Sequence, residues 1–423
     1  MRTEATSADQ RTPLIVVSGL QQEQVREVAR TLHRQSPGNT ALLHHDLRHI
    51  GEGIVRRTLR RGSTEQRAVL ELAHGCVSCT LREDLLPLLR ELAADSDVDR
   101  IVVELDPAVE PEAVCWALQH VVVNGGTAVD DARIEAVVTV VDLPTWLADA
   151  GGDEMLTERG LPGSPDDERT VAQLAVGQVE FADALVLSGD DTDHWNTVRT
   201  HAVLDRLAPT APRARLADFN PTALLNRIPA NSRRGEVDGP HGRLLRGQPP
   251  LEPDAGVSVV VFHERRPFHP GRLHDALDVL LDGVVRTRGR AWVASQPDAV
   301  LWLESAGGGL NVGHAGPWLA ALPLEQWTDV DPEQQTKALL AWDDYYGDRM
   351  QELVVIAHRA DPEEITRALR AALLTDEELA AGQQQWLHYP DPFSDWHTDP
   401  CADPDVDEMS GAIADGDIAK EKP

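Results

Sequence analysis

The sequence contains almost no lysine: the only ones are Lys337, Lys420 and Lys422, so the first 336 of its 423 residues have none. Acidic side chains are abundant instead, with 70 Asp and Glu against 39 Lys and Arg and a formal net charge of -31. A field of this sign repels a phosphate backbone. We therefore expect no direct binding to nucleic acid.

Long apolar runs are also missing. No stretch reaches the roughly 18 consecutive apolar residues of a membrane-spanning helix, so we expect no membrane association. The first residues lack the apolar segment of a secretory signal. The four cysteines, at positions 76, 79, 115 and 401, are too few for a disulfide scaffold in a chain of this length. These absences together favour a reduced, cytoplasmic protein.

Short apolar runs, in contrast, recur through the first half of the chain. Those predicted to be strands span residues 14–17, 40–44, 100–105, 135–143 and 182–187. Patterns typical of helices lie between them, at about 23–32, 83–92, 111–121 and 170–178. Nearly all-apolar strands that alternate with helices are typical of a parallel sheet covered on both faces. We therefore predict the α/β fold class.

Composition divides the chain into five parts. We predict a disordered N-terminus at 1–12, a first domain at 13–230, a linker at 231–256, a second domain at 257–396 and a disordered acidic tail at 397–423. The linker is rich in Arg, Gly and Pro and has no apolar periodicity. The second domain begins with a strand and closes with a strand and a helix, which indicates a smaller α+β domain.

The most informative segment is Glu71-Leu-Ala-His-Gly-Cys-Val-Ser-Cys-Thr-Leu-Arg-Glu-Asp-Leu-Leu86. Cys76 and Cys79 lie three residues apart beside a glycine, so both thiolates can face one metal ion, and thiolates favour tetrahedral zinc. His74 could supply a third ligand. The alternative is that the two cysteines are buried small hydrophobic residues in a tight turn.

The same segment resembles the signature of CobW-type GTPases, Asn-Gly-Cys-x-Cys-Cys-Thr before a helix that begins Arg-x-Asp-Leu. Ser78 stands where that family has its central cysteine, and His74 stands at its asparagine. Further matching segments are Gln178–Asp183, Phe219–Pro221, Arg266–Pro270, Gly316–Trp318, Gly347–Leu353 and Leu374–Asp376. The resemblance implies a P-loop NTPase-like parallel sheet domain followed by a smaller α+β CobW C-terminal domain.

The phosphate-binding loop of that family corresponds to Ser18–Arg26. Gln22 and Gln24 occupy the positions of its glycines, Val25 that of the lysine and Arg26 that of the hydroxyl that ligates magnesium. Without these groups the backbone cannot wrap phosphates and no ammonium neutralises them. Only Ser18, Gly19 and Arg26 remain as candidate nucleotide contacts in this loop.

Two further nucleotide motifs of the family are altered. Its Glu-Thr-x-Gly corresponds to Glu104-Leu-Asp-Pro107, and proline has no N–H with which to contact a γ-phosphate. Its guanine-reading Asn-Lys-x-Asp corresponds to Ser188-Gly-Asp-Asp191. Glu104 and Asp191 are either residual nucleotide contacts or solvated turn residues. We expect hydrolysis to be weak or absent, and we expect no standard binding of GTP with magnesium.

A second polar group follows the predicted strand at 40–44. His44, His45 and His49 lie with Asp46 in a segment where the resemblance places the switch region of the GTPases. Such residues are metal ligands or form an ordinary polar loop. Both interpretations remain open at this point.

The resemblance is strongest to an actinobacterial branch of the family, the MRF type, described as recruiting a ribosome hibernation factor. It implies that this protein binds a hibernation-promoting factor and delivers it to the small ribosomal subunit when zinc is scarce. The alternative is a GTP-dependent zinc metallochaperone that hands metal to a client protein. A third is a structural GTPase-like scaffold that binds neither ligand. An acidic body suits a basic, RNA-binding partner.

Overall fold

A computed structural model describes residues 11–36, 38–72, 75–161, 163–164, 167–190 and 193–393. Most of the predicted N-terminal segment, all of the predicted tail, His74 and Asp191 lie outside these residues. None of the helices in the described ranges has the length and apolarity needed to cross a bilayer.

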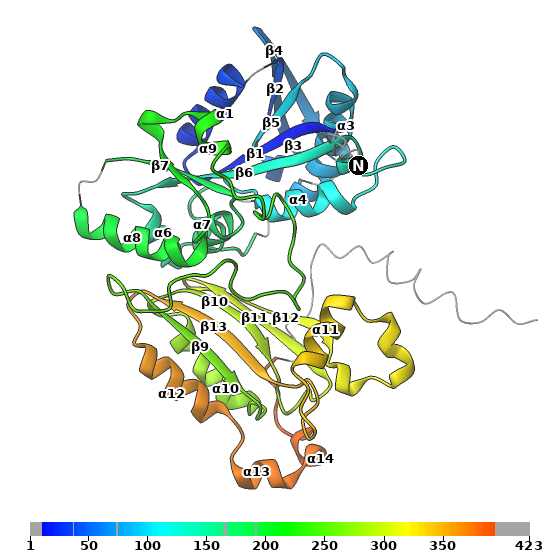
Figure 1. The fold of residues 1–423 in the computed structure, drawn as a ribbon, viewed down its shortest axis with the longest axis vertical. Helices are drawn as coiled ribbons and strands as arrows, with labels where there is room; N and C mark the ends of the chain where they lie inside the picture. The colour runs from blue at the N-terminus through cyan, green and yellow to red at the C-terminus, as the bar shows by residue number, and fades with distance from the viewer. Residues whose placement is uncertain are drawn as a thin grey trace, which may run out of the picture.

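The first domain is built on an eight-stranded sheet with the order β4-β3-β2-β5-β1-β6-β7-β8 (Figure 1). The strands are β1 Thr12–Ser18, β2 Thr40–His49, β3 Ile54–Arg61, β4 Thr64–Glu71, β5 Arg100–Glu104, β6 Ala132–Asp142, β7 Ala184–Ser188 and β8 Arg213–Arg215. Pairing is parallel along β2-β5-β1-β6-β7-β8, whereas β3 pairs antiparallel with both β2 and β4. The predicted α/β class with a parallel sheet is confirmed.

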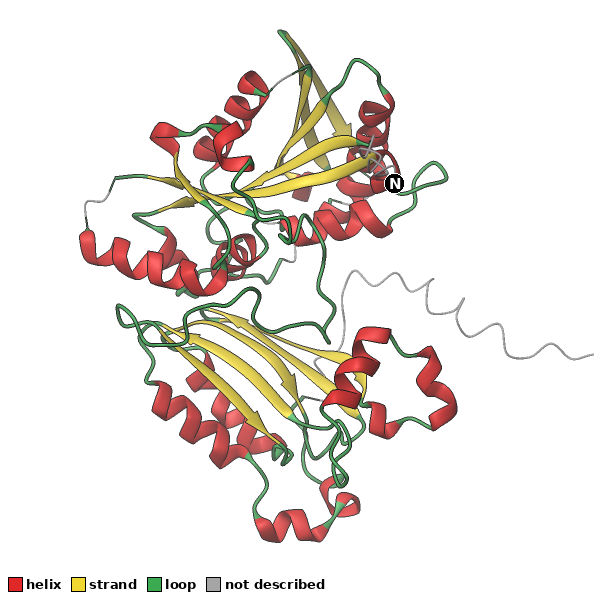
Figure 2. Cartoon of the chain, in the orientation of Figure 1, coloured by secondary structure: helices red, strands yellow, loops and turns green. Residues whose placement is uncertain are grey.

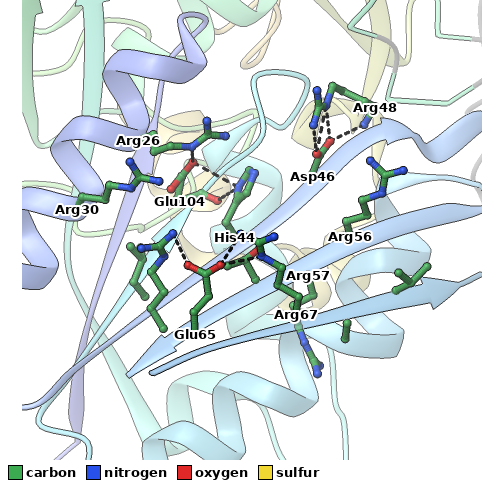
Figure 3. Close-up of a pocket in the computed structure, with 15 residues that line it drawn as sticks. Arg26, Arg30, His44, Asp46, Arg48, Arg56, Arg57, Glu65, Arg67 and Glu104 are labelled. Atoms are coloured by element: carbon green, nitrogen blue, oxygen red, sulfur yellow. Dashed lines mark hydrogen bonds and ion pairs between the residues drawn. The ribbon is translucent and has the colours of Figure 1, made fainter. Parts of the chain in front are cut away.

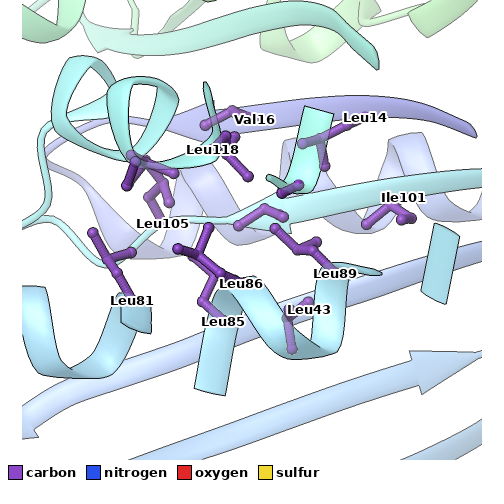
Figure 4. Packing of buried hydrophobic residues seen from close by; sticks show 14 of the residues in the cluster. Leu14, Val16, Leu43, Leu81, Leu85, Leu86, Leu89, Ile101, Leu105 and Leu118 are labelled. Carbon is purple, nitrogen blue, oxygen red and sulfur yellow. The ribbon is translucent and has the colours of Figure 1, made fainter. Parts of the chain in front are cut away.

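Helices cover both faces of this sheet (Figure 2). They are α1 Gln22–Gln35, α2 Val77–Thr80, the π-helical turn η2 Leu81–Leu85, α3 Leu86–Ala94, α4 Pro111–His120, α5 Ala128–Asp131, α6 Trp146–Ala150, α7 Val171–Glu180, α8 His194–Leu207 and α9 Pro221–Leu225, with 3-10 turns at Ile50–Glu52 and Leu216–Asp218. Alternate residues of β1 face opposite sides: Ile15 and Val17 pack against α1, whereas Leu14 and Val16 pack against α3 and α4 (Figure 4). The all-apolar strand pattern is therefore explained by burial on both faces.

The hairpin of β3 and β4 was not predicted. β3 carries four arginines and β4 is largely exposed, so neither strand forms an apolar run. The hairpin also corrects the position of the histidine group. His44, His45, Asp46 and His49 do not follow the second strand but lie within β2, which extends to His49 because it pairs with β3.

The second domain is a five-stranded antiparallel sheet with the order β12-β11-β10-β13-β9, and it matches the predicted smaller α+β unit. Its strands are β9 Ser258–Glu264, β10 Val284–Ala291, β11 Ala299–Ala306, β12 Gly309–Pro317 and β13 Gln351–Ala357. Its helices are α10 Pro270–Ala276, α11 Pro332–Leu340, α12 Pro362–Ala372, α13 Asp376–Ala381 and α14 Gln383–Trp386, with 3-10 turns at Leu277–Leu280, Leu319–Ala321 and Leu324–Asp329. α10 and α12 pack on one face of the sheet.

The other face of this sheet meets the first domain (Figure 1). Glu180, at the end of α7, accepts hydrogen bonds from Arg286 Nη2 at 2.7 Å and Arg288 Nη1 at 3.2 Å. Burial opposes ionisation of Glu180, yet these guanidiniums lower its pKa to about 2. The predicted linker, residues 231–256, contains no helix and packs along β10, where Arg290 Nε donates to Pro240 O at 2.8 Å.

Candidate functional site

In the segment that corresponds to the phosphate loop, most of the residues belong to a helix and only a short connection precedes it. β1 ends at Ser18 and α1 begins at Gln22, so only Gly19–Gln21 connect them. The first helical turn is complete, with Val25 N donating to Gln21 O at 3.1 Å. Glutamine favours a helix over glycine by a few tenths to about 1 kcal/mol per residue. The missing glycines therefore turn a loop that would wrap phosphates into the first turn of α1.

Val25, the residue at the position of the catalytic lysine, is a core residue with 0% exposure. It packs against Gly19, whose φ is +151°. A Cβ on Gly19 would lie 2.7 Å from Val140 O and 2.9 Å from Val25 Cγ2. Glycine is therefore required at position 19 for the packing of β1, α1 and β6, whether or not the segment binds phosphate.

Glu104 lies at the end of β5 and is only 4% exposed. Gln22 Nε2 donates to its Oε1 at 2.8 Å, and Arg26 Nε lies 3.4 Å from the same oxygen. His44 Nδ1 lies 3.1 Å from the Glu104 carbonyl oxygen and 3.7 Å from Oε1. The protein's own side chains therefore neutralise a carboxylate that, in a nucleotide site, would face magnesium.

Two serines of the nucleotide motifs, Ser18 and Ser188, end neighbouring parts of the same sheet. Ser18 Oγ shares a hydrogen bond of 2.8 Å with Thr139 Oγ1, so it faces the core. Ser188 Oγ donates to Asp142 Oδ1 at 3.0 Å. Asp191 lies outside the described residues. Ser18, Gly19, Arg26 and Glu104 are therefore adjacent, and internal contacts involve Ser18 Oγ, Arg26 Nε and Glu104 Oε1.

Asp106 holds the segment that follows Glu104, a role that the sequence analysis missed. Its carboxylate accepts hydrogen bonds from Leu47 N and Ala108 N, each at 3.1 Å. Burial raises the pKa of Asp106. An aspartate before a proline is a turn signal that could have identified it. The segment is thereby fixed against β2.

The cysteine pair begins the helix that leads to α3. Cys76 caps α2, and its Sγ accepts a hydrogen bond from Cys79 N at 3.5 Å. Gly75 is required next to it, because a Cβ there would lie 2.0 Å from Ile50 O. Both thiols are partly exposed, and Ser78 between them is exposed. Cys76 and Cys79 therefore lie on one turn, and neither residue is buried.

Cys115 provides the contrast within the same domain. It lies in α4, it is fully buried, and burial raises the pKa of its thiol. A cysteine that serves only as a small apolar residue has these properties. Cys76 and Cys79 are not buried in this way, which favours the metal-binding interpretation of the pair.

Of the three predicted zinc ligands, Cys76 and Cys79 lie in the described residues. Within the described ranges, no three His, Cys, Asp or Glu side chains converge to hold a metal ion. The predicted third ligand, His74, is outside those ranges. Two partly exposed cysteines on one turn nevertheless fit the donor chemistry of zinc.

The histidine group of β2 has other partners. His45 Nε2 lies 2.7 Å from Asp84 Oδ2, and Arg57 Nη1 donates to Asp84 Oδ1 at 2.6 Å. Burial lowers the pKa of His45, against the opposing effect of Asp84. Asp46 pairs with Arg48, and His49 Nδ1 lies 3.4 Å from Glu52 Oε1. These contacts are structural.

Asp84 lies in the π-helical turn η2, so its two partners tie the cysteine helix to the sheet. A cavity of about 20 Å³ separates this helix from the Glu104 segment, and residues of both line it, including Val77, Leu81, Glu104 and Asp106. π-helical turns are frequent at functional sites. Only this small cavity therefore separates the cysteine helix from the segment that contains Glu104.

Comparison with known families now identifies both domains. Residues 28–215 match the CobW/HypB/UreG nucleotide-binding domain, and residues 257–373 match the cobalamin synthesis protein cobW C-terminal domain. This chain belongs to the CobW family. The first match begins at residue 28, beyond the segment that corresponds to the phosphate loop.

Two relatives cover most of this CobW-family chain. A protein of Mycobacterium tuberculosis named zinc chaperone is 49% identical over 403 residues, which are 92% of this chain and 95% of the relative. The zinc-regulated GTPase metalloprotein activator 1 of Dictyostelium discoideum is 29% identical over 79% of this chain and 72% of its own length. Among solved structures, the Zn(II)-bound YjiA GTPase from E. coli is similar over 86% of this chain and 99% of its own, at 15% identity and a TM-score of 0.35.

Proposed function

We propose that this CobW-family protein carries zinc as cargo, holds it at Cys76 and Cys79, and does not depend on efficient GTP hydrolysis. The observation that carries the proposal is the partly exposed pair of thiols on one turn. The names of two relatives, zinc chaperone and zinc-regulated GTPase metalloprotein activator, support a zinc-linked role. His74 is proposed as a third ligand, which leaves a fourth position for a ligand from the client.

The geometry of the phosphate-loop segment supports the proposal that the protein does not depend on efficient GTP hydrolysis. A helix begins where the loop should be, Val25 is buried, and Glu104 is neutralised by Arg26. The first domain contains no lysine with which to replace the missing ammonium. Zinc transfer would then be driven by exchange of thiolate ligands with the client and not by a nucleotide cycle.

Competition with a chromophoric zinc chelator tests the cargo site. We expect Cys76→Ser and Cys79→Ser each to weaken zinc binding by at least about tenfold, because each removes a direct ligand. Cys115→Ala is the matched control, since that thiol is buried, and should bind zinc like the wild type. Unchanged affinity in both serine variants would refute the site.

A phosphate-release assay with GTP and Mg²⁺ tests the proposal that the protein does not depend on efficient GTP hydrolysis. We expect no turnover above background for the wild-type protein. Turnover together with tight nucleotide binding would instead favour the GTP-dependent metallochaperone.

A second candidate is recruitment of a ribosome hibernation-promoting factor to the small ribosomal subunit under zinc limitation. Two observations favour it: a closed phosphate-loop segment suits a scaffold, and a net charge of -31 suits a basic partner. Co-sedimentation of the protein, the purified factor and small subunits, with and without a zinc chelator, tests it. We expect more factor on the subunits when this protein is present. Equal amounts with and without it would refute recruitment.

A further inference from the structure

A pocket of about 390 Å³ lies between α1 and the β2–β3–β4 part of the sheet (Figure 3). Arginine dominates its lining, although the guanidinium of Arg57 pairs with Asp84 outside the pocket. The charged lining residues are Arg26, Arg30, Arg48, Arg56, Arg57, Arg60 and Arg67, and Asp46, Glu65 and Glu104. This concentration of positive charge is opposite to the net charge of the whole chain. The pocket shares Arg26 and Glu104 with the altered nucleotide site, but neither the cysteine turn nor the Gly19–Gln21 connection lines it, and most of its lining comes from β2, β3 and β4.

Strand register explains how the arginines converge. Arg60 pairs with Leu42 and Arg56 pairs with Asp46, so alternation along β3 places both on the sheet face that packs against α1. Arg26 and Arg30 lie one turn apart on α1 and approach from the other side (Figure 3). Arginines of α1, β2, β3 and β4 therefore line one space.

The carboxylates in the pocket are already paired. Asp46 accepts from Arg48 Nε at 2.9 Å, and this hydrogen bond lowers the pKa of Asp46 to about 2 despite partial burial. Glu65 lies between Arg60 and Arg67 and pairs with both.

Two arginines have no such partner. Arg30 and Arg56 form no ion pair with any carboxylate in the part of the chain that the structure describes. Arg67, with Arg60 and Arg30, lowers the pKa of Glu65, so three guanidiniums share this one carboxylate. Guanidinium groups in excess of the neighbouring carboxylates repel one another. The pocket is therefore electrostatically prepared for an external anion.

The chemistry of the lining indicates which anion. Arginine forks bind phosphate with two parallel hydrogen bonds, and several forks around one space favour several phosphate groups. The volume falls in the range of small-molecule pockets. Leu42, Ala68 and Val69 add an apolar wall beside the charged groups. We infer that this pocket binds a small molecule that carries two or more linked phosphates, a function separate from zinc binding.

Calorimetric titration with inorganic tripolyphosphate tests the inference. Arg30→Gln combined with Arg56→Gln removes the two unpaired charges, and both side chains are exposed, so the variant should fold. Arg199→Gln combined with Arg367→Gln is the matched control: it removes two exposed arginines outside the pocket. We expect the first variant to bind tripolyphosphate at least about tenfold more weakly than the wild type, and the control to change less than about twofold.

Three results would overturn the inference. They are a wild-type protein that does not bind tripolyphosphate, equal weakening in both double variants, and binding of single-stranded RNA that tripolyphosphate does not displace. Titrations with ATP and GTP identify the source of the phosphates. Tighter binding of a nucleotide than of tripolyphosphate supports a ligand whose base uses the Leu42 and Val69 wall, and equal binding supports phosphate recognition alone.

Zinc titration of the same Arg30→Gln and Arg56→Gln variant separates the two proposals. We expect its zinc affinity to equal that of the wild type, so failure of the phosphate pocket would leave the cysteine site standing. Loss of zinc binding in this variant would contradict the separation of the two sites.

Discussion

The segment Ser18–Arg26 and the turn Cys76–Thr80 both correspond to functional motifs of the CobW family, but only one of them keeps its functional groups accessible. In the first, Val25 is buried in the core and Arg26 faces Glu104. In the second, both thiols remain partly exposed. The difference is that, in this chain, the positions of one family motif serve packing and internal ion pairs.

The two segments also differ in what stabilises them. Local helix propensity and the core contact of Val25 with Gly19 close the first segment. The cysteine turn instead depends on a polar anchor, in which Asp84 binds His45 and Arg57. Substitutions at Val25 and Asp84 test whether these contacts stabilise the two segments.

The largest effect is expected for Val25→Lys, which restores the family's lysine at a position with 0% exposure. Burial of an unpaired ammonium should lower the free energy of unfolding by roughly 3 kcal/mol or more. Urea unfolding measures it, with Arg26→Lys as the control at the partly exposed neighbouring position. A Val25→Lys protein as stable as the wild type would show that the first turn of α1 opens readily.

A smaller effect is expected for Asp84→Asn, which removes the charge that binds His45 and Arg57. Loss of this partly buried anchor should cost about 1–3 kcal/mol of unfolding free energy. It should also weaken zinc binding, because the anchor positions the cysteine helix. Asp376→Asn, on a side chain that is 91% exposed, is the control. Weaker zinc binding without any loss of stability would indicate that Asp84 acts on the metal directly.

The smallest effect is expected from the pH dependence of His45. Burial lowers its pKa in the folded protein, so the unfolded chain, with a histidine pKa near 6.5, takes up the proton first. Its contribution to stability is therefore present above about pH 6.5 and is lost as the pH falls below that value. We expect His45→Asn to reduce the slope of unfolding free energy between about pH 7 and 5 by less than 1.4 kcal/mol per pH unit. An unchanged slope would contradict a buried neutral His45.

Much of the fold was predictable because the strands of the parallel sheet are buried on both faces. Such strands form apolar runs, and those at residues 14–17 and 100–105 correspond to β1 and β5. The β3–β4 hairpin was not predictable in the same way, since its arginines face solvent or a polar pocket. That missing hairpin also led to the wrong placement of His44 and His45 after β2.

The candidate site was predictable in its residue types but not in its contacts. The resemblance predicted Ser18, Gly19, Arg26 and Glu104 as neighbours, and the structure places them at one edge of the sheet. It did not predict that Gln22 would bond to Glu104, because the two residues come from different elements. His74 and Asp191 remain predictions.

The sequence by itself determined which chemical groups are available. No lysine can serve a phosphate site in the first domain wherever the chain folds, and the spacing of Cys76 and Cys79 lets one helical turn carry both thiols. Only the tertiary structure decided which groups are buried, paired or open. It placed Val25 in the core and gathered Arg30 and Arg56 from α1 and β3 around one pocket. The reason is that burial and charge pairing depend on strand register and helix packing between residues far apart in the chain, which local composition does not specify.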